Sequence, residues 1–565
     1  MKLLRGRRGS IKTAVAIVSA CCCAGAVQAY QFETDPDFVV NLDNSLQYTL
    51  GWRAQNIDPK IGNHLFFDQG DYKFPHKGDL VTNRFQDLVE FQTVYKQKLG
   101  FRVTGSFWKD WAYDDVARQN PAFVGIVPNA YPTGHYSPYT NRFYRQGGEL
   151  LDAFVFLNTE IADKPVYVKA GRLTQYWGNA FFFGFSNIAY SQHPIDFIKG
   201  FSQPGSEVKE LFLPRKQILL SADLSPELSV SGQYFFEYKP NRYPDSGTFL
   251  GFFDPLFNGP PNLGALNFYG IAPNEGIERV KNNNGNFGVK ANWSPKWAGG
   301  DMGFYYRQFD EVHPWLLLVN PATGGAGDPV AKKVKLVGFS YEKGFGLIST
   351  GFELNQRRHT ALYTQPLVPT TQGAKGTITN FIANTFVQLG KTPVWDSGIL
   401  LAEISYTHLN KVTDDPLKIY HGVGQPTCLA NDNPTGADGP GNWQDGCATN
   451  NSLAFATLFI PQWQQVFAGV DIETPISYTM GVHGNPAYQA GSFYFEGTAL
   501  TSIGIKATYQ AKSSVLLQYN HYRWRPKNTT DPLGMGLPSF AGFGGAGAVS
   551  LNDRAWWQLQ FKTSF

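Results

Sequence analysis

The chain of 565 residues carries 48 basic and 45 acidic residues, and charged residues make up only 16% of it. A nucleic-acid-binding protein is expected to carry a basic excess, so this near-neutral balance excludes that class. Aromatic residues reach 15%, while no run beyond the N-terminal region approaches the roughly 20 apolar residues of a transmembrane helix. This combination favours a membrane β-barrel, because alternating strands dilute the apolar signal of any one window.

The first 29 residues have the pattern of a secretory signal peptide. Five basic residues precede an apolar run over 14–27, and Val27-Gln28-Ala29 supplies a signal-peptidase site. The run is too short to span a membrane. A twin-arginine signal and a lipoprotein box ending at Cys21 are the alternatives. We therefore predict a signal peptide over 1–29 and one exported domain over 30–565.

Segments with one apolar and one polar face recur along the exported chain. Clear examples lie at 46–53, 101–107, 287–293 and 493–509, where aromatic and aliphatic residues alternate with polar ones. A period of two residues predicts half-buried strands. A soluble sandwich would alternate as well, but aromatic residues at the strand ends favour the girdles of a membrane barrel.

The connections between these strands alternate between short turns, such as 98–100, and long Gly/Pro/Asn-rich loops, such as 109–147. This is the pattern of short periplasmic turns and long extracellular loops. We predict an all-β fold, a transmembrane antiparallel up-and-down β-barrel of about 18 strands. A hairpin is expected at Thr474-Pro475; if that region is one longer strand, the barrel has 16. A barrel of this size encloses a lumen wider than side chains alone fill.

One long connection carries a succession of motifs that the others lack. In order these are Gly171-Arg172, Trp177-Gly178, a Phe-rich stretch over 181–185 with Asn187, Pro194-Ile195-Asp196, and a Pro-Gly-x-Glu-x-Lys-Glu run over 204–210 followed by Leu211-Phe212-Leu213-Pro214. The succession resembles an uncharacterised family of proteobacterial outer-membrane proteins, domain of unknown function 1302, and the resemblance covers most of the exported chain. It implies a porin-type barrel, of a kind often suspected of handling hydrophobic or aromatic compounds and lipids. At Asn179 members commonly carry an acid, so any role tied to that acid is in doubt here.

The aromatic residues of 175–214 predict that this segment is buried. Large exposed apolar patches are rare, and irregular backbone at membrane depth is tolerated only inside protein or beside a water-filled cavity. We expect the segment to fold inward and narrow the lumen; covering the outer rim is the alternative. Strand parity puts Arg172 on the lipid side unless a bulge turns it inward. The candidate lumen and constriction residues are Arg172, Tyr176, Trp177, Asn179, Phe183, Phe185, Asn187, Asp196, Glu207, Lys209 and Glu210.

Two cysteines, Cys428 and Cys447, remain once the signal peptide is removed, and both lie in a long loop predicted over 409–462. A pair of cysteines in an oxidising compartment predicts a disulfide. The sequence shows no nucleophile elbow, no zinc-binding His pair and no phosphate-binding glycine loop. We therefore predict that the protein is not an enzyme, with no catalytic residue, metal or cofactor.

The last strand ends the chain on an aromatic residue, with Leu559, Phe561 and Phe565 on one face. It resembles the closing strand of bacterial outer-membrane barrels, where the terminal Phe is part of the signal read by the assembly machinery. We therefore expect the outer membrane of a Gram-negative bacterium. The expected partners are outer-membrane lipids and lipopolysaccharide, the barrel-assembly machinery and a small hydrophobic solute, with no nucleic acid; the oligomeric state is left open. The predicted function is a porin-like channel for diffusion or transport of small hydrophobic or aromatic solutes across the outer membrane, with a lipid-acting barrel enzyme, a role in surface assembly or an adhesin as alternatives.

Overall fold

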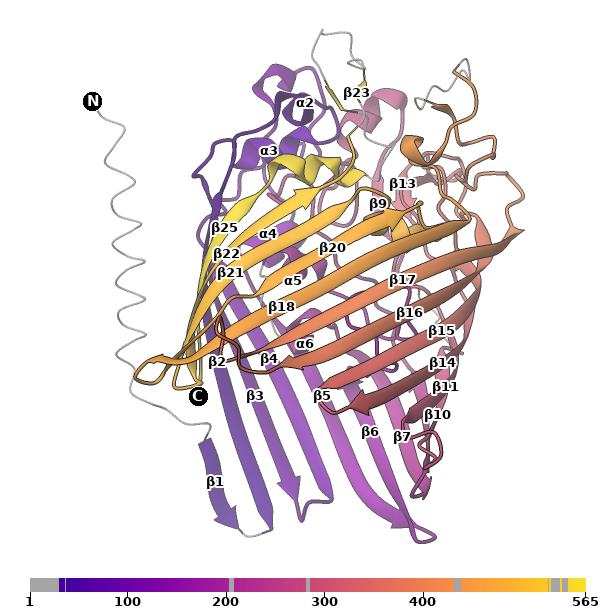
Figure 1. The fold of residues 1–565 in the computed structure, drawn as a ribbon. Coiled ribbons are helices and arrows are strands. Elements are labelled where there is room, and N and C mark those ends of the chain that lie inside the picture. The colour runs from indigo at the N-terminus through magenta and orange to yellow at the C-terminus, as the bar shows by residue number, and fades with distance from the viewer. Residues whose placement is uncertain are drawn as a thin grey trace.

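The computed structural model describes residues 30–35, 37–202, 208–280, 285–430, 438–526, 528–529, 539–540 and 547–565. The predicted signal peptide, 1–29, lies outside them. One antiparallel sheet closes on itself as a tilted barrel, with long loops at one end and short turns at the other (Figure 1). No helix in the described ranges is long and apolar enough to cross a membrane.

Eighteen strands form the wall within the described residues, as the sequence predicts, and each pairs with its neighbours in chain order. They are β2 (Phe38–Arg53), β3 (Leu80–Tyr95), β4 (Leu99–Asp110), β5 (Gln146–Ile161), β6 (Lys164–Leu173), β7 (Arg215–Ser225), β8 (Leu228–Phe235), β10 (Phe287–Trp293), β11 (Asp301–Phe309), β14 (Val334–Phe345), β15 (Ile348–Ala361), β16 (Lys375–Leu389), β17 (Ser397–Asp414), β18 (Asn451–Phe467), an interrupted strand made of β19 (Val470–Glu473) and β20 (Ile476–His483), β21 (Ala499–Tyr509), β22 (Ser513–Arg523) and β25 (Trp556–Ser564).

The remaining elements are not among these eighteen strands. The helices are α2 (Pro59–Gly62), α3 (Asp68–Lys73), η1 (Pro121–Phe123), α4 (Pro138–Tyr144), α5 (Phe197–Ser202), α6 (Val208–Leu211), η2 (Gly264–Tyr269), η4 (Trp443–Asp445), η5 (Gln489–Tyr494) and η6 (Gly547–Asp553). The short strands are β1 (Tyr30–Asp35), which pairs with β2, β9 (Asn274–Ile277), β12 (Leu318–Val319), β13 (Ala326–Asp328), β23 (Asn528–Thr529) and β24 (Ser539–Phe540).

The barrel closes between β2 and β25, as the C-terminal pattern predicts. The two strands pair from Ser45 opposite Ser564 to Arg53 opposite Trp556. Beyond them, Asn44 and Phe565 exchange two backbone hydrogen bonds of 2.8 and 2.9 Å. The terminal residue therefore completes the seam of the wall.

One predicted hairpin is misplaced, although the strand number is right. The turn between β18 and the next strand lies at Ala468-Gly469, where Gly469 has φ +75°, and Thr474-Pro475 instead interrupts that next strand between β19 and β20. Proline has no N–H to donate to a ladder, so pairing lapses there without a turn. The loop predicted over 409–462 spans only 415–450, and it holds a disulfide between Cys428 and Cys447, whose Cα atoms are 5.7 Å apart.

A second difference concerns the stretch predicted as a strand over 493–509. The strand β21 begins at Ala499, and residues 489–494 instead form the short helix η5 in the preceding loop. Gly481 and Gly497 allow this departure: a Cβ at Gly481 would lie 2.1 Å from the Phe495 carbonyl oxygen, and Gly497 has φ +86°. Phe493 is thereby taken out of the wall.

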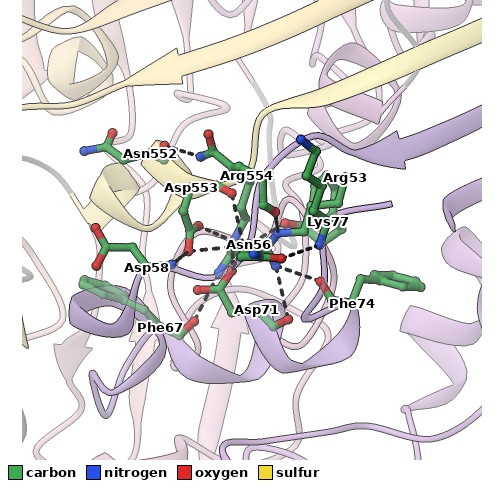
Figure 2. Close-up of polar contacts among 12 residues, drawn as sticks. Arg53, Asn56, Asp58, Phe67, Asp71, Phe74, Lys77, Asn552, Asp553 and Arg554 are labelled. Carbon is green, nitrogen blue, oxygen red and sulfur yellow. Dashed lines mark hydrogen bonds and ion pairs between the residues drawn. The ribbon is translucent and has the colours of Figure 1, made fainter. Parts of the chain in front are cut away.

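The long loops pack over one end of the barrel around a buried apolar core and a buried ion-pair network. Figure 2 shows Asp71 of α3 between Arg53, at the end of β2, and Arg554, just before β25. The Asp71 Oδ1 atom lies 2.9 Å from Arg53 Nη2 and 3.0 Å from Arg554 Nε, and all three side chains are buried. Arg53 and Arg554 also donate to the carbonyls of Phe74 and Phe67, at 2.8 and 3.1 Å. The network therefore ties the first long loop to both strands of the seam.

Candidate functional site

The described parts of the connection between β6 and β7, residues 174–202 and 208–214, lie inside the barrel, and we call them the lumen segment. Its backbone is hydrogen-bonded to Glu353 of β15 and Glu403 of β17. The neighbouring side chains Leu354 and Ile404 are 45% and 41% exposed, whereas the two glutamates are buried. Because side chains alternate across a strand, the outward face carries Leu354 and Ile404 and the inward face carries the glutamates. Figure 1 shows α5 and α6, which belong to this segment, within the outline of the barrel.

The two glutamates each accept three backbone N–H groups of the lumen segment. This stretch has little secondary structure of its own, so its N–H groups need other acceptors when they are buried. The donors to Glu353 are Asn179 and Ala180, at 2.6 and 3.0 Å from Oε1, and Ile188, at 2.8 Å from Oε2. The donors to Glu403 are Phe182 and Phe183, at 2.9 and 2.8 Å from Oε1, and Phe181, at 2.5 Å from Oε2.

Arginines of the inner wall bind the carbonyl groups of the same segment. Arg307 of β11 donates to the carbonyls of Ile188 and Tyr190, at 2.7 and 2.8 Å. Arg215 of β7 donates to two further carbonyls, at 3.0 and 2.9 Å. Arg357 of β15 lies over the ring of Tyr190, with its Cζ 4.2 Å from the centroid. Wall charges of both signs therefore hold this part of the segment in place.

Glycines of the wall make room for the segment. A Cβ at Gly288 would lie 2.7 Å from the Trp177 ring, and one at Gly338 would lie 3.0 Å from Ile188. Within the segment, Gly178 has φ +95°, and a Cβ there would lie 2.2 Å from Glu353 Oε1. The Trp-Gly motif therefore has a structural reason, since a larger residue at Gly178 would displace the carboxylate that binds the next two N–H groups.

Two of the acidic candidates, Asp196 and Glu210, have polar partners, one in a loop and one on the wall. Asp196 forms an ion pair of 2.5 Å with Arg242, which belongs to the loop after β8 rather than to the wall. Glu210 accepts a hydrogen bond of 2.8 Å from the amide of Gln86 on β3. Glu207 and the side chain of Lys209 lie outside the described residues.

Arg172 does not line the lumen, so its inclusion among the constriction candidates was wrong. The pairing of β6 with β7 runs without a bulge and places Arg172 opposite Lys216, whose side chain is exposed. The next pair is Leu173 and Arg215, both buried. The alternation of side chains along β6 therefore continues through Arg172 and leaves its side chain on the outward face.

Aromatic residues of the segment line a cavity of about 140 Å³, which we call the lumen cavity. Its lining includes the candidates Tyr176, Phe185 and Asn187, together with His193. Burial lowers the pKa of His193 to about 3, so its imidazole is neutral. Trp177 and Phe183 are buried behind this lining; Trp177 packs on Tyr305 and Phe183 on Tyr494, with centroid distances of 6.3 and 5.1 Å. Asn179 donates its side-chain amide to the Tyr341 carbonyl at 3.2 Å.

A second cavity of about 60 Å³, the outer cavity, lies among the long loops and is also lined largely by apolar residues, including Phe252 and Phe493. A stack of rings connects the linings of the two cavities. Phe185 stacks on Phe197 and on Phe493, with centroids 5.5 and 5.7 Å apart, and Phe493 meets Phe252 edge-on at 6.0 Å. Aromatic surface therefore continues from the long loops to the lumen cavity.

Sequence reasoning missed the roles of Phe493, Glu353 and Glu403. The alternation around Phe493 predicts a strand, although the glycines at 491 and 497 are a signal against it. Acids at inward positions of the strands were a signal for Glu353 and Glu403, but nothing local indicates what they bind. Arg307 likewise faces inward, and the structure buries it against the lumen segment.

The fold and its internal segment define a membrane β-barrel whose lumen is narrowed by one of its own connections. A family model described as "Protein of unknown function (DUF1302)" matches residues 10–565, so the chain belongs to this family. No curated protein matches it significantly.

Solved structures with similarity over most of the chain include Acinetobacter baumannii OccAB4, which is 9% identical with a TM-score of 0.41 over 95% of this chain and 100% of that one. Pseudomonas aeruginosa OccK9 (OpdG) is 10% identical with a TM-score of 0.43 over 93% and 98%. Pseudomonas aeruginosa OpdK, solved with vanillate, is 9% identical with a TM-score of 0.42 over 93% and 98%. At these values the similarities carry no functional argument.

Proposed function

We propose that the protein is an outer-membrane channel for small hydrophobic or aromatic solutes. The observation that carries the proposal is the run of aromatic rings joining the outer cavity to the lumen cavity inside a closed barrel. The long loops then face the exterior and the short turns the periplasm, as in outer-membrane barrels.

The charged and the uncharged inner residues have different roles, and this difference supports the proposal. The charged wall residues Glu353, Glu403, Arg215 and Arg307 bind the backbone of the lumen segment. Among the described residues that line either cavity, none is Asp, Glu, Lys or Arg. A solute would therefore meet ring faces and neutral polar groups, which favour apolar compounds over ions.

The ring stack is the expected constriction. Phe185 and Phe197 line the lumen cavity, Phe493 lines the outer cavity, and the three rings contact one another, so we expect a solute to pass between the cavities when these side chains rotate. The backbone of the lumen segment stays fixed to the wall, because its N–H and carbonyl groups have charged partners there.

Conductance and uptake test this proposal. Deleting residues 179–203 should remove the constriction, raising single-channel conductance in planar bilayers and sensitivity of cells to large antibiotics. Phe185→Ala is a smaller change that should raise the flux of apolar solutes into proteoliposomes. The matched control is Phe381→Ala, which removes an outward-facing ring of β16 that is 37% exposed. If the deletion changes neither conductance nor uptake, the segment is not a constriction; a protein that conducts nothing would favour the adhesin or surface-assembly alternatives.

A further inference from the structure

The lumen cavity has the size of a single aromatic ring. Its volume is about 140 Å³, close to the engineered apolar cavity of ~150 Å³ that binds benzene. Rings of Tyr176, Phe185 and Phe212 contribute to its lining. The described lining contains no charged side chain, since His193 is neutral. A bound molecule should therefore be small, flat and uncharged.

One polar group in the lining lacks a partner. Asn187 is 2% exposed, and its Oδ1 atom has no hydrogen-bond partner among the described residues. The orientation of the amide follows from its neighbour. The Tyr176 hydroxyl donates its only proton to the Ala180 carbonyl at 2.6 Å, so it can only accept the 3.0 Å hydrogen bond from Asn187 Nδ2. The acceptor oxygen of Asn187 is the atom left free.

A second acceptor lies in the same lining. His193 Nδ1 is 3.2 Å from the Gln175 carbonyl, a contact that requires the proton on Nδ1. The Nε2 atom of this neutral ring is therefore unprotonated and can accept a hydrogen bond. The His193 ring stacks on Phe212 with centroids 3.8 Å apart, which fixes its orientation. The cavity thus combines ring faces with hydrogen-bond acceptors, which favours an aromatic ligand that donates a hydrogen bond.

We propose that the lumen cavity binds neutral single-ring compounds that carry a hydroxyl group, of the size and chemistry of phenol, with Asn187 Oδ1 accepting the hydroxyl proton. This inference rests on the proposed channel function and names its substrate class. An aromatic carboxylate is disfavoured, because no cation in the described lining would compensate its buried charge. An unsubstituted or methylated ring would fit, but it would leave Asn187 Oδ1 unpaired.

Calorimetric titration of the purified protein in detergent with phenol, toluene and sodium benzoate tests the assignment. Phenol and toluene have nearly the same size, so the ratio of their dissociation constants measures the contribution of the hydroxyl group to affinity. The wild-type protein should bind phenol about tenfold more tightly than toluene, as expected for one buried hydrogen bond. Benzoate should not compete. Asn187→Leu, which keeps the branched shape of the side chain but removes its hydrogen-bonding groups, should bind the two neutral rings equally.

Tyr176→Phe is the matched control. It removes the same Asn187–Tyr176 hydrogen bond but leaves Asn187 Oδ1 in place, so it should retain the preference for phenol. Equal affinity for phenol and toluene in the wild-type protein overturns the assignment. A preference that survives in Asn187→Leu, or that is lost equally in Tyr176→Phe, also overturns it. Bilayer conductance reports on the channel separately: phenol binding without conductance would reject the channel and leave the site standing.

Discussion

Replacing Glu403 with glutamine should loosen the lumen segment without unfolding the barrel. The carboxylate accepts the N–H groups of Phe181, Phe182 and Phe183 with its two oxygen atoms. A glutamine amide has one acceptor oxygen and one NH₂ donor. If the amide oxygen keeps the hydrogen bonds from the N–H groups of Phe182 and Phe183, the NH₂ group faces the N–H of Phe181. Two donors then oppose each other.

The magnitude follows chiefly from the lost contact with Phe181, because the other donor to the same oxygen atom, Asn384 Nδ2, is 3.5 Å away and its hydrogen bond is weak. Leaving a buried donor unsatisfied costs about 1–3 kcal/mol. The hydrogen bond of Phe181 is only partly buried, so we expect the lower part of this range, about 1–2 kcal/mol, which corresponds to roughly 5–30-fold in population. The barrel ladder on either side of Glu403 is unchanged, since the pairing of β17 with β16 and β18 uses backbone groups.

Hydrogen exchange measured by mass spectrometry is the appropriate assay. Peptides covering 179–188 should exchange roughly 5–30-fold faster in Glu403→Gln, by the same population argument, while peptides of the wall keep their protection. Glu473→Gln is the control, because Glu473 pairs with Lys506 at 2.8 Å near the short-turn end. Unchanged exchange of 179–188 in Glu403→Gln would refute the view that this carboxylate holds the segment.

Two further predictions concern the wall and the loops. Deleting Phe565 should reduce the amount of heat-modifiable barrel in outer-membrane fractions, because the deletion removes both backbone hydrogen bonds with Asn44; normal insertion would show that this end is dispensable for assembly. Replacing Cys428 and Cys447 with serine should destabilise the loop over 415–450 by about 3 kcal/mol in the chain-entropy model, because it opens the disulfide between residues 19 apart. Limited proteolysis should then cut this loop faster with barrel insertion unchanged, whereas two free thiols in the wild-type protein would contradict the pairing.

The sequence by itself determined the wall of the barrel. Alternation of apolar and polar residues is a local property, so segments such as 46–53 and 287–293 show which side chains share a face before any partner is known. The same parity correctly placed Arg172 on the outward face, although its motif had suggested a lumen position. The aromatic richness of 175–214 likewise required burial, and the glycine of Trp177-Gly178 marked a backbone position that larger residues would strain.

Tertiary structure alone decided what the lumen segment touches. Glu353 and Glu403 lie 174 and 222 residues beyond Asn179 and Phe181, the residues whose N–H groups they accept. Parity shows that these carboxylates face inward, but the residue each one meets depends on how many strands close the barrel and in what register. Phe493 reaches Phe185 for the same reason, across a loop whose course follows from close contacts at Gly481. Contacts across a lumen join residues distant in sequence, and no local period encodes them.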